Sequence, residues 1–589
     1  MGNGPAGWFR RKRLRPYLAV AAVVALGAGA AAGATAASAT TTPTVTFAGY
    51  QAPATVPTAL YHDNTSTPIK HVVVIFDENE SFDHYFGTYP YAANTDGTPF
   101  VAKPGTPKVN GLYTNITKSG PVGPLLTSNP NEYNPQRLTP SEALTGSNNH
   151  DYTPEQKAED NGKMDMFVQE TEQSTPSAGC APEYCPPGIV MDYYDGNTTT
   201  ALWNYAQYYS LSDNNCDTSF GPSSPGAVNV TSGNTSGAKA LNPAWDPTDP
   251  SAPSTSSGIV DVNSSTGLGV LNGDSDPYYD ACSDTNHTTD GSLAVLTGQN
   301  IGNLLNSEHV TWGWFQGGFA PTSTTDGLPV CGSTHDNIGG VAVQDYVPHH
   351  DPFQFYASTA NPDHVAPSKL SEIGYTDQAN HQYDISDFTD ALDGTGGAQL
   401  PSVSYLKAPA YENGHPGNSD PIDEQRWLVN TINSIEQSKY WPSTAIVVTY
   451  DDSDGWYDHQ APKITNGSDD AATDTAECTA VAVTVGTNND RCGPSQRLRM
   501  LVISPWTREN YVSNNLTDTT SVVKFIEDNW LRGERISGSF DASAGSLDAP
   551  GGLLDFHGKP NFQPVILNPT TGAVVSGGNW YGNEGKTKP

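Results

Sequence analysis

Three short apolar segments of the sequence end abruptly, and two of them end in clusters of acids. Residues 71–76 read HVVVIF and are followed by Asp77-Glu78-Asn79-Glu80, and residues 444–450 read TAIVVTY and are followed by Asp451-Asp452. The third segment, residues 499–504, reads RMLVIS. Short β-branched runs bounded by turn-forming residues are typical of strands buried on both faces, as in a parallel sheet covered by helices. These segments therefore predict an α/β fold.

Two segments carry the 3.6-residue periodicity of amphipathic helices. Residues 421–441 repeat apolar residues on one face, and residues 519–533 do the same before Gly533, a residue that favours the end of a helix. With the strands, they predict a mainly parallel sheet that carries helices on both faces. The apolar positions are Leu428, Ile432 and Ile435 in the first segment and Val522, Ile526 and Trp530 in the second.

The middle of the chain has a different composition. Residues 220–345 are rich in Ser, Thr, Asn, Gly and Asp and show little periodicity. Because the strands on either side read as parts of one sheet, we expect long surface insertions in a single domain over residues 67–589, and not a second domain. Residues 40–66 are rich in Thr, Ala and Pro, which is typical of a flexible lead-in.

The first residues have the pattern of an export signal. Residues 1–39 contain a basic segment, then an apolar Ala/Val stretch, then Ala37-Ser38-Ala39, which matches an A-x-A cleavage site. The pair Arg10-Arg11 favours twin-arginine export, whereas Arg13 stands where that signal usually has an apolar residue, so an ordinary Sec signal stays open. The stretch is rich in Ala and Gly and weakly hydrophobic, which argues against a stable membrane anchor. We expect a secreted protein.

Charge and cysteines restrict the partners and the compartment. Removing the five basic residues of the signal segment takes the formal charge from −35 to −40, and such a protein repels nucleic acid at neutral pH. Seven cysteines fit an oxidising compartment. Proximity in the sequence favours the pairs Cys180–Cys185 and Cys478–Cys492 and allows Cys282–Cys331, which leaves Cys216 unpaired.

The acids after the two apolar segments predict a metal site. In parallel α/β sheets, ligands bind outside the carboxyl ends of the strands. Two strands that both end in acids would bring Glu78, Asn79, Asp451 and Asp452 together. Oxygen ligands of this kind suit a hard divalent cation such as Ca²⁺, Mg²⁺ or Mn²⁺. The alternative is a pair of acidic turns in contact with solvent.

A serine in a turn supplies a candidate nucleophile. The stretch GPSSPGAVN, residues 221–229, could present Ser223 at a Gly/Pro-shaped turn that leads into a helix. Backbone N–H groups at the start of a helix receive anions such as phosphate. A serine beside a cation can lose its proton and attack phosphorus, which forms a phosphoseryl intermediate. Most serines in such turns only shape the turn.

Several stretches now carry a resemblance. In this order, they resemble the successive motifs of the bacterial phosphoesterase family, which contains phospholipases C and an acid phosphatase of the same build. The resemblance covers roughly residues 71–560 and implies an alkaline phosphatase-like core with a metal-assisted nucleophile at a helix start. The stretches are HVVVIFDENESFDHYFG (71–87), GKMDMFV (162–168), GPSSPGAVN (221–229), TYDDSDGWYDHQAP (449–462), and LVISPWTR with TTSVVKFIEDNW (501–530).

The resemblance assigns roles to individual residues. It implies Ser223 as the nucleophile, and Asn79 as a residue that contacts both the metal and the phosphate. It implies that the other metal ligands are Glu78, Asp451 and Asp452. Imidazole can protonate a leaving alkoxide or hold a phosphate oxygen, and the resemblance places four histidines in the site. These are His150, His350 and His415 as catalytic residues and His349 as a substrate-binding residue.

One departure from the family concerns charge. The family commonly has Arg after Glu-Asn, at the position where this chain has Glu80. The change puts substrate preference in question more than the type of reaction.

The sequence as a whole predicts a secreted enzyme that hydrolyses phosphoric ester bonds. Family phospholipases C often carry extra C-terminal β-domains, for which this chain has no room after residue 560, so an acid phosphatase-like phosphomonoesterase is favoured. Phospholipase C is the alternative, and the partner is then a phospholipid headgroup and not a small phosphate ester. A divalent-ion-binding surface protein without catalysis is a lower alternative, against which the presence of Ser223 and the histidines argues.

Overall fold

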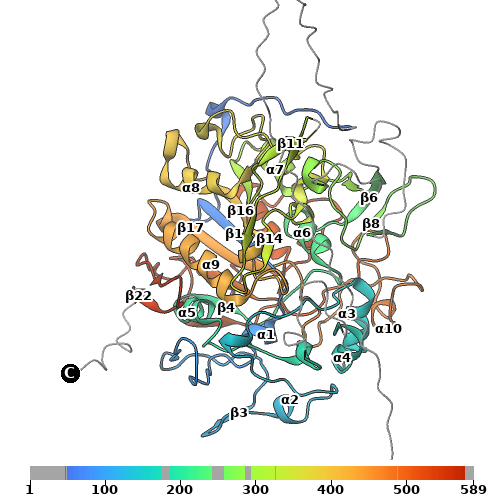
Figure 1. The fold of residues 1–589 in the computed structure, drawn as a ribbon. Helices are drawn as coiled ribbons and strands as arrows, with labels where there is room; N and C mark the ends of the chain where they lie inside the picture. Colours follow the sequence, from blue (N-terminus) through green and yellow to red (C-terminus); the bar gives the residue numbers. More distant parts are fainter. Residues whose placement is uncertain are drawn as a thin grey trace, which may run out of the picture. The chain divides into compact units, whose positions relative to one another are not determined.

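The two acid-tipped segments are neighbouring strands. In the computed structural model, β1 (His71–Asp77) and β17 (Thr444–Tyr450) run parallel, with His71 opposite Thr444 and Asp77 opposite Tyr450. They lie at the centre of an eight-stranded sheet with the order β15-β10-β16-β1-β17-β18-β4-β19 (Figure 1). The other strands are β15 (Gln382–Asp384), β10 (Trp312–Gln316), β16 (Val403–Lys407), β18 (Met500–Ile503), β4 (Ser210–Ser212) and β19 (Tyr511–Ser513).

The structure describes residues 47, 49–173, 186–241, 258–284, 293–325, 327–486 and 488–577. The export signal expected over residues 1–39 and the pair Cys180–Cys185 lie outside these residues. Among the residues described, no helix combines the length and the apolar character that crossing a bilayer requires.

One strand runs against the others. β18 pairs antiparallel with both β17 and β4, whereas the remaining pairs in the sheet are parallel. The prediction that this apolar segment belongs to the sheet is confirmed, but the expected parallel direction is wrong. A parallel neighbour needs a crossover connection, usually a helix. The described part of the connection from β17 to β18 holds only the four-residue helix α10 (Ala476–Thr479).

Helices cover both faces of the sheet, as the sequence predicts. Alternate residues of β1 point to opposite sides, with Val73 and Ile75 in one apolar core and Val72 and Val74 in the other. The first core includes residues of α5 (Thr200–Tyr208), α8 (Ile385–Asp393) and α9 (Pro421–Glu436). The second includes residues of α6 (Ser223–Ser232), α7 (Ile301–Ser307) and α11 (Ser521–Trp530). Figure 1 shows α8 and α9 on one side of the sheet and α6 on the other.

The stretch 220–345 contains more regular structure than its composition predicts. It holds α6, α7 and β10, which is a strand of the central sheet. It also forms a separate four-stranded antiparallel sheet with the order β7-β8-β6-β9. The sequence missed β10 because Trp312-Gly-Trp-Phe-Gln316 is aromatic and not an aliphatic run. The strands of the separate sheet are β6 (Ser236–Leu241), β7 (Ile259–Val260), β8 (Gly269–Leu271) and β9 (Leu293–Leu296).

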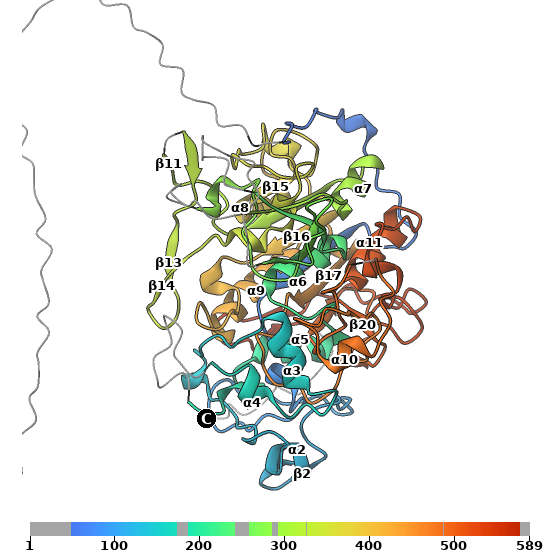
Figure 2. The same ribbon diagram turned by 90° about the vertical axis from the view of Figure 1, so that its right-hand side faces the viewer.

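The remaining elements are short. One hairpin, β13 (Thr334–Asp336) with β14 (Ala342–Gln344), lies at the left of Figure 2. The other strand pairs are β2 (Asn115–Thr117) with β3 (Gly120–Val122), β5 (Asn215–Cys216) with β20 (Thr517–Asp518), β11 (Ser323–Thr325) with β12 (Leu328–Val330), and β21 (Ile566–Leu567) with β22 (Val574–Ser576). The other helices are α1 (Phe82–Phe86), α2 (Pro124–Thr127), α3 (Tyr152–Glu159) and α4 (Phe167–Glu170).

Candidate active site

The four predicted metal ligands meet at the carboxyl ends of β1 and β17. Glu78, Asn79, Asp451 and Asp452 are all fully buried. Asp451 Oδ1 accepts hydrogen bonds from the backbone N–H of Asn79 at 3.3 Å and of Asp452 at 2.9 Å. Asn79 has a φ of 44°, in the left-handed region that Asn tolerates, and this turns the chain as β1 ends. The prediction that the two strand ends form one cluster is therefore confirmed, while the role of each residue as a ligand stays a prediction.

Ser223 lies beside this cluster as the first residue of α6. Its hydroxyl donates to Asp452 Oδ2 at 2.9 Å and accepts from Asn79 Nδ2 at 3.3 Å. The side chain is buried, and Pro222 precedes it at the N-cap. One turn further on, a Cβ at Gly226 would lie 2.2 Å from the carbonyl oxygen of Asp451, so only glycine allows α6 to pack this closely. The helix therefore delivers its first hydroxyl to the strand-end acids.

Burial makes Asp451 and Asp452 hard to ionise without a cation. Burial, together with the charge of Glu78, raises the pKa of Asp451 to about 6, although Lys407 and His350 act in the opposite direction. Burial likewise raises the pKa of Asp452 well above its usual value, against the charge of His150. A bound divalent cation would favour the ionised form of both carboxylates.

Lys407 is a member of the site that sequence analysis missed. It is the last residue of β16, which pairs in parallel with β1. Its fully buried ammonium forms an ion pair with Glu78 Oε1 and lies 3.4 Å from Asp451 Oδ2. Burial lowers the pKa of Lys407, but the charges of Asp451 and Glu78 outweigh burial and raise it. The sequence feature that could have revealed Lys407 is its position at the end of the run SVSYLK. A charged side chain at the end of a buried strand needs a partner of opposite charge.

The four predicted histidines occupy different places around the acids. His350 Nδ1 lies 2.9 Å from Glu78 Oε1, so this histidine joins the cluster directly. The others are held by groups at its edge. His150 Nδ1 lies 3.0 Å from Asp454 Oδ1, His349 Nδ1 lies 3.0 Å from Asp276 Oδ1, and His415 Nδ1 lies 2.7 Å from the carbonyl oxygen of Pro416, with the rings of His150 and His415 6.4 Å apart.

The surroundings of these histidines give them different protonation states. Burial, Lys407 and His349 lower the pKa of His350 well below its usual value, so it is neutral. Burial also acts to lower the pKa of His349, but the charges of Asp274 and Asp276 raise it to about 9. His150 is affected in the same way by Asp452 and Asp454, and its pKa is raised well above the usual value. His150 and His349 are therefore positively charged at neutral pH.

Two acids from residues 258–284 also reach the site, and sequence analysis did not predict them. Asp274 Oδ1 accepts hydrogen bonds from the backbone N–H of Ser224 at 2.9 Å and from its hydroxyl at 3.0 Å. The carboxylate therefore caps the start of α6 one residue after Ser223. Asp276 holds His349, as described above. Both acids lie in the loop after β8, and no spacing rule links such a loop to the ends of β1 and β17.

Glu80, which stands where the family commonly has Arg, has a histidine and an arginine near it in the fold. Glu80 is buried, and its carboxylate lies 3.2 Å from His84 Nε2. Burial raises the pKa of Glu80 well above its usual value, and Arg499 is the main group that opposes this rise. The Arg499 guanidinium is itself buried between the rings of Tyr85 and Tyr450, at 3.6 and 3.5 Å from their centroids. Arg499, just before β18, is therefore the nearby positive charge that opposes the effect of burial on Glu80.

The donor groups fit a hard divalent cation. Glu78 Oε2 is fully buried and has no hydrogen-bond partner among the described residues. Asn79 Oδ1, Ser223 Oγ and Asp452 Oδ2 lie beside one another through the contacts given above. Oxygen donors that are buried and incompletely hydrogen-bonded are the type that Ca²⁺, Mg²⁺ and Mn²⁺ bind. The predicted ligand set is thus chemically suitable.

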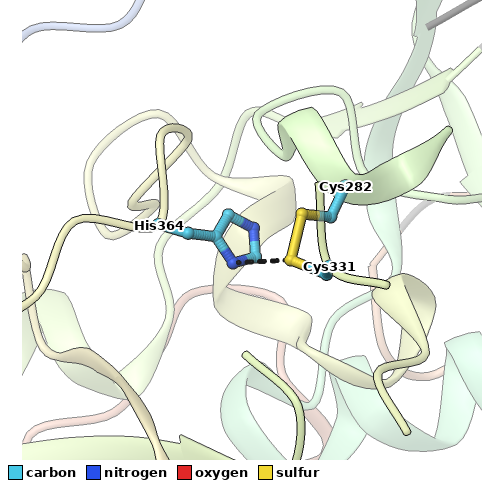
Figure 3. Close-up of side chains that lie close together, drawn as sticks. All are labelled: Cys282, Cys331 and His364. Carbon is cyan, nitrogen blue, oxygen red and sulfur yellow. Dashed lines mark hydrogen bonds between the residues drawn. A yellow bond between two sulfur atoms is a disulfide. The ribbon is translucent and has the colours of Figure 1, made fainter. Parts of the chain in front are cut away.

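Another close group of side chains is not suited to a metal. Cys282, Cys331 and His364 lie together, but the two sulfur atoms form a disulfide, with His364 Nδ1 3.4 Å from Cys331 Sγ (Figure 3). A metal needs free thiolates, so this group is structural. The pairs Cys282–Cys331 and Cys478–Cys492 and the free, buried Cys216 are as predicted.

Known sequences resemble this chain over parts of its length. The Phosphoesterase family matches residues 69–531. The non-hemolytic phospholipase C of Pseudomonas aeruginosa is 34% identical over 138 residues, which cover 22% of this chain and 20% of that protein. The non-hemolytic phospholipase C of Burkholderia pseudomallei is 35% identical over 133 residues, covering 22% and 19%. The hemolytic phospholipase C of P. aeruginosa is 29% identical over 173 residues, covering 29% and 23%. The chain spans about a fifth of the length of these relatives.

Solved structures resemble the chain weakly. An inactive variant of murine ectonucleotide pyrophosphatase/phosphodiesterase 5 in complex with AMP matches with a TM-score of 0.28 at 9% identity, over 59% of this chain and 94% of that one. A protein in the alkaline phosphatase superfamily from Vibrio parahaemolyticus matches with a TM-score of 0.26 at 11% identity, over 60% and 65%. Scores this low carry no argument about the present chain.

Proposed function

This chain belongs to the phosphoesterase family, and from that premise we propose that it hydrolyses phosphoric esters, that Ser223 is its nucleophile and that a divalent cation assists it. The observation that carries the proposal is the position of the Ser223 hydroxyl. It lies at the first residue of α6, 2.9 Å from Asp452 Oδ2 and 3.3 Å from Asn79 Nδ2. A hydroxyl at a helix start, beside carboxylates that suit a cation, is a site for attack on a phosphoryl group.

The proposed reaction has two steps. Ser223 Oγ gives up its proton to solvent and attacks phosphorus, and the bond from phosphorus to the alcohol oxygen breaks. The departing alkoxide takes a proton from a charged imidazole at the edge of the site, and His150 and His349 are the candidates. Water then gives a proton to that imidazole and attacks the phosphoserine, the bond from phosphorus to Ser223 Oγ breaks to release phosphate, and Oγ takes a proton back from solvent. A cation bound by Glu78, Asn79, Asp451 and Asp452 would neutralise charge on the nucleophile and on the phosphoryl oxygens.

We propose a phosphomonoester as the preferred substrate. A monoester carries two negative charges on its phosphate, and the charged His150 and His349 with the start of α6 suit such a dianion. Phospholipase C activity is the second candidate, because the curated relatives are phospholipases C. A phospholipid headgroup is the substrate in that case.

Two chromogenic substrates separate these candidates. Purified protein is assayed with Mg²⁺, Mn²⁺ or Ca²⁺ on p-nitrophenyl phosphate and on p-nitrophenylphosphorylcholine. We expect a higher kcat/KM on the monoester. A higher value on the phosphorylcholine diester would favour phospholipase C and leave the Ser223 mechanism intact, whereas no turnover of either would argue against both.

We also propose that the protein is exported, on the strength of the signal pattern in residues 1–39. The two disulfides support an oxidising compartment. The division into a lead-in and a single domain over residues 67–589 remains a prediction, as does the absence of nucleic acid among its partners.

A further inference from the structure

The strand-end acids form two adjacent donor sets. The first comprises Ser223 Oγ, Asn79 Oδ1 and Asp452 Oδ2. The second comprises Glu78, His350 and Asp451, each of which offers one ligand atom within 4.8 Å of the other two. Glu78 and Asp451 are shared by the two sets. Asp451 Oδ1 faces the backbone of Asn79 and Asp452 while its Oδ2 faces Lys407, and Glu78 Oε1 contacts Lys407 while its Oε2 has no hydrogen-bond partner among the described residues. By composition, each set could hold a cation.

The ammonium group of Lys407 lies among the ligand atoms of the second set. Lys407 Nζ contacts Glu78 Oε1, the same oxygen that His350 Nδ1 approaches at 2.9 Å, and it lies 3.4 Å from Asp451 Oδ2. It is also 3.4 Å from the carbonyl oxygen of Asp77 and 4.7 Å from the centre of the Phe76 ring. The lysine is fully buried at the end of a central strand, so its position is fixed by the sheet.

Two cations side by side are a known device in phosphoryl transfer. Two-metal phosphatases hold their ions roughly 3.5–4 Å apart and use them to stabilise the attacking and the leaving oxygen. We propose that the Lys407 ammonium takes the place of a second metal ion, so that this chain binds one divalent cation where its donor groups would otherwise hold two. The inference rests on the proposed function for its catalytic meaning, and it concerns metal count and not substrate.

An ammonium group and a metal ion interact with the second donor set in different ways. An ammonium neutralises Glu78 and donates hydrogen bonds to it, whereas a metal would accept electron pairs from Glu78, His350 and Asp451. Removing the ammonium leaves two buried carboxylates and an imidazole without their cation, which is costly unless another cation enters. A small divalent ion is the natural replacement.

Metal counting tests the inference. Purified protein is stripped with a chelator, folding is checked by circular dichroism, and Mn²⁺ binding is measured by calorimetry and by elemental analysis. We expect one Mn²⁺ per chain in the wild type and two in Lys407→Met. Two ions close together should also give a spin-coupled electron paramagnetic resonance spectrum in the variant alone. Lys103→Met is the matched control, because Lys103 is another buried lysine that pairs with Glu509 outside the site, and it should bind one ion.

A double variant locates the additional ion. His350 belongs only to the second donor set, so Lys407→Met/His350→Ala should return to one Mn²⁺ per chain. Two ions in the wild type would overturn the inference, and so would any count other than two in folded Lys407→Met. If that variant does not fold, the count is made on Lys407→Gln with the same criterion. These counts require no turnover, so a protein that binds metal as expected but hydrolyses no phosphate ester would refute the proposed function and leave this inference standing.

Discussion

The two strand ends and the loop after β8 both place acids in the neighbourhood of Ser223, but they do so by different means. Asp451 and Asp452 follow a central strand, and their position relative to Glu78 is set by the pairing of β1 with β17. Asp274 and Asp276 follow β8, an inner strand of the separate four-stranded sheet, and hydrogen bonds to Ser224 and His349 hold them. Backbone pairing fixes the first group, whereas side-chain contacts fix the second.

The difference bears on what each region does. The strand-end acids are buried, and Asp452 accepts a hydrogen bond from the Ser223 hydroxyl, so we expect these acids to bear directly on turnover. The acids of the loop contact only the residue after the nucleophile and a histidine at the edge. We therefore expect them to adjust charge and proton transfer, with smaller effects. The following predictions test this ranking.

The largest effect should come from Ser223→Ala. The change removes the nucleophile and only a small polar group, so the fold should persist while kcat falls by on the order of 10³-fold or more. Steady-state kinetics on p-nitrophenyl phosphate, with melting temperature as the check on folding, measure this. A variant that kept more than about a tenth of wild-type kcat would exclude a phosphoseryl mechanism.

Metal removal should come next. Chelation should abolish activity and lower the melting temperature together, since a ligand bound only to the folded state adds about 2.7 kcal/mol at a hundredfold excess over Kd. Asp451→Asn and Asp452→Asn should each weaken the metal by at least about tenfold and flatten the chelator-induced shift in melting temperature. Scanning fluorimetry with and without EDTA measures it. An unchanged melting temperature with activity intact would mean that these acids hold no metal.

The metal-free protein should show a distinctive pH dependence. The pKa of Asp451 is raised to about 6 in the folded state. At pH values between this pKa and the ordinary pKa of an aspartate, the folded state binds a proton that the unfolded state releases. Stability of the metal-free protein should therefore rise as the pH falls from 7 toward 4. Asp451→Asn should reduce this dependence, and melting curves across that range measure it.

Asp276→Asn should have a moderate effect. Without this carboxylate, the pKa of His349 should fall from about 9 toward its ordinary value. Because His349 must carry a proton to act as an acid, the decline of kcat/KM on the alkaline side of the pH profile should then begin at lower pH. At pH 8 we expect roughly a tenfold loss on alkyl phosphates, whose leaving groups need a proton, and little loss on p-nitrophenyl phosphate. Asp336→Asn, in the exposed hairpin β13–β14, is the control. Equal losses on both substrates would show that Asp276 only supports the fold.

The smallest effect should come from Asp77→Asn. Burial and the charge of Glu424 raise the pKa of Asp77 well above its ordinary value, so its carboxyl is uncharged in the folded state and resembles the amide. Turnover should stay within about twofold of the wild type. At pH 7 the wild type must take up a proton as it folds, so the variant should be equally or slightly more stable, with the difference vanishing near pH 4. A large loss of activity would place Asp77 in the site.

The sequence predicted what the sheet determines. The apolar runs, their acidic ends and the periodic helices were enough to place Glu78 beside Asp451 and Ser223 at a helix start, because strand pairing and helix geometry are local rules. It did not predict the direction of β18, which depends on the connection, or the aromatic strand β10. Lys407, Arg499 and Asp274 were also missed, since each owes its role to a partner remote in sequence, and no local pattern marks such a partner.

We propose that the strand-end cluster activates Ser223 to form a covalent intermediate. Rapid acid quenching of the metal-loaded enzyme during turnover of p-nitrophenyl phosphate, followed by digestion and mass spectrometry, tests it directly. We expect a phosphoryl group on Ser223, absent from Ser223→Ala and from chelated enzyme. A phosphoryl group on another residue, or none in enzyme that turns over with a pre-steady-state burst of p-nitrophenol, would contradict it.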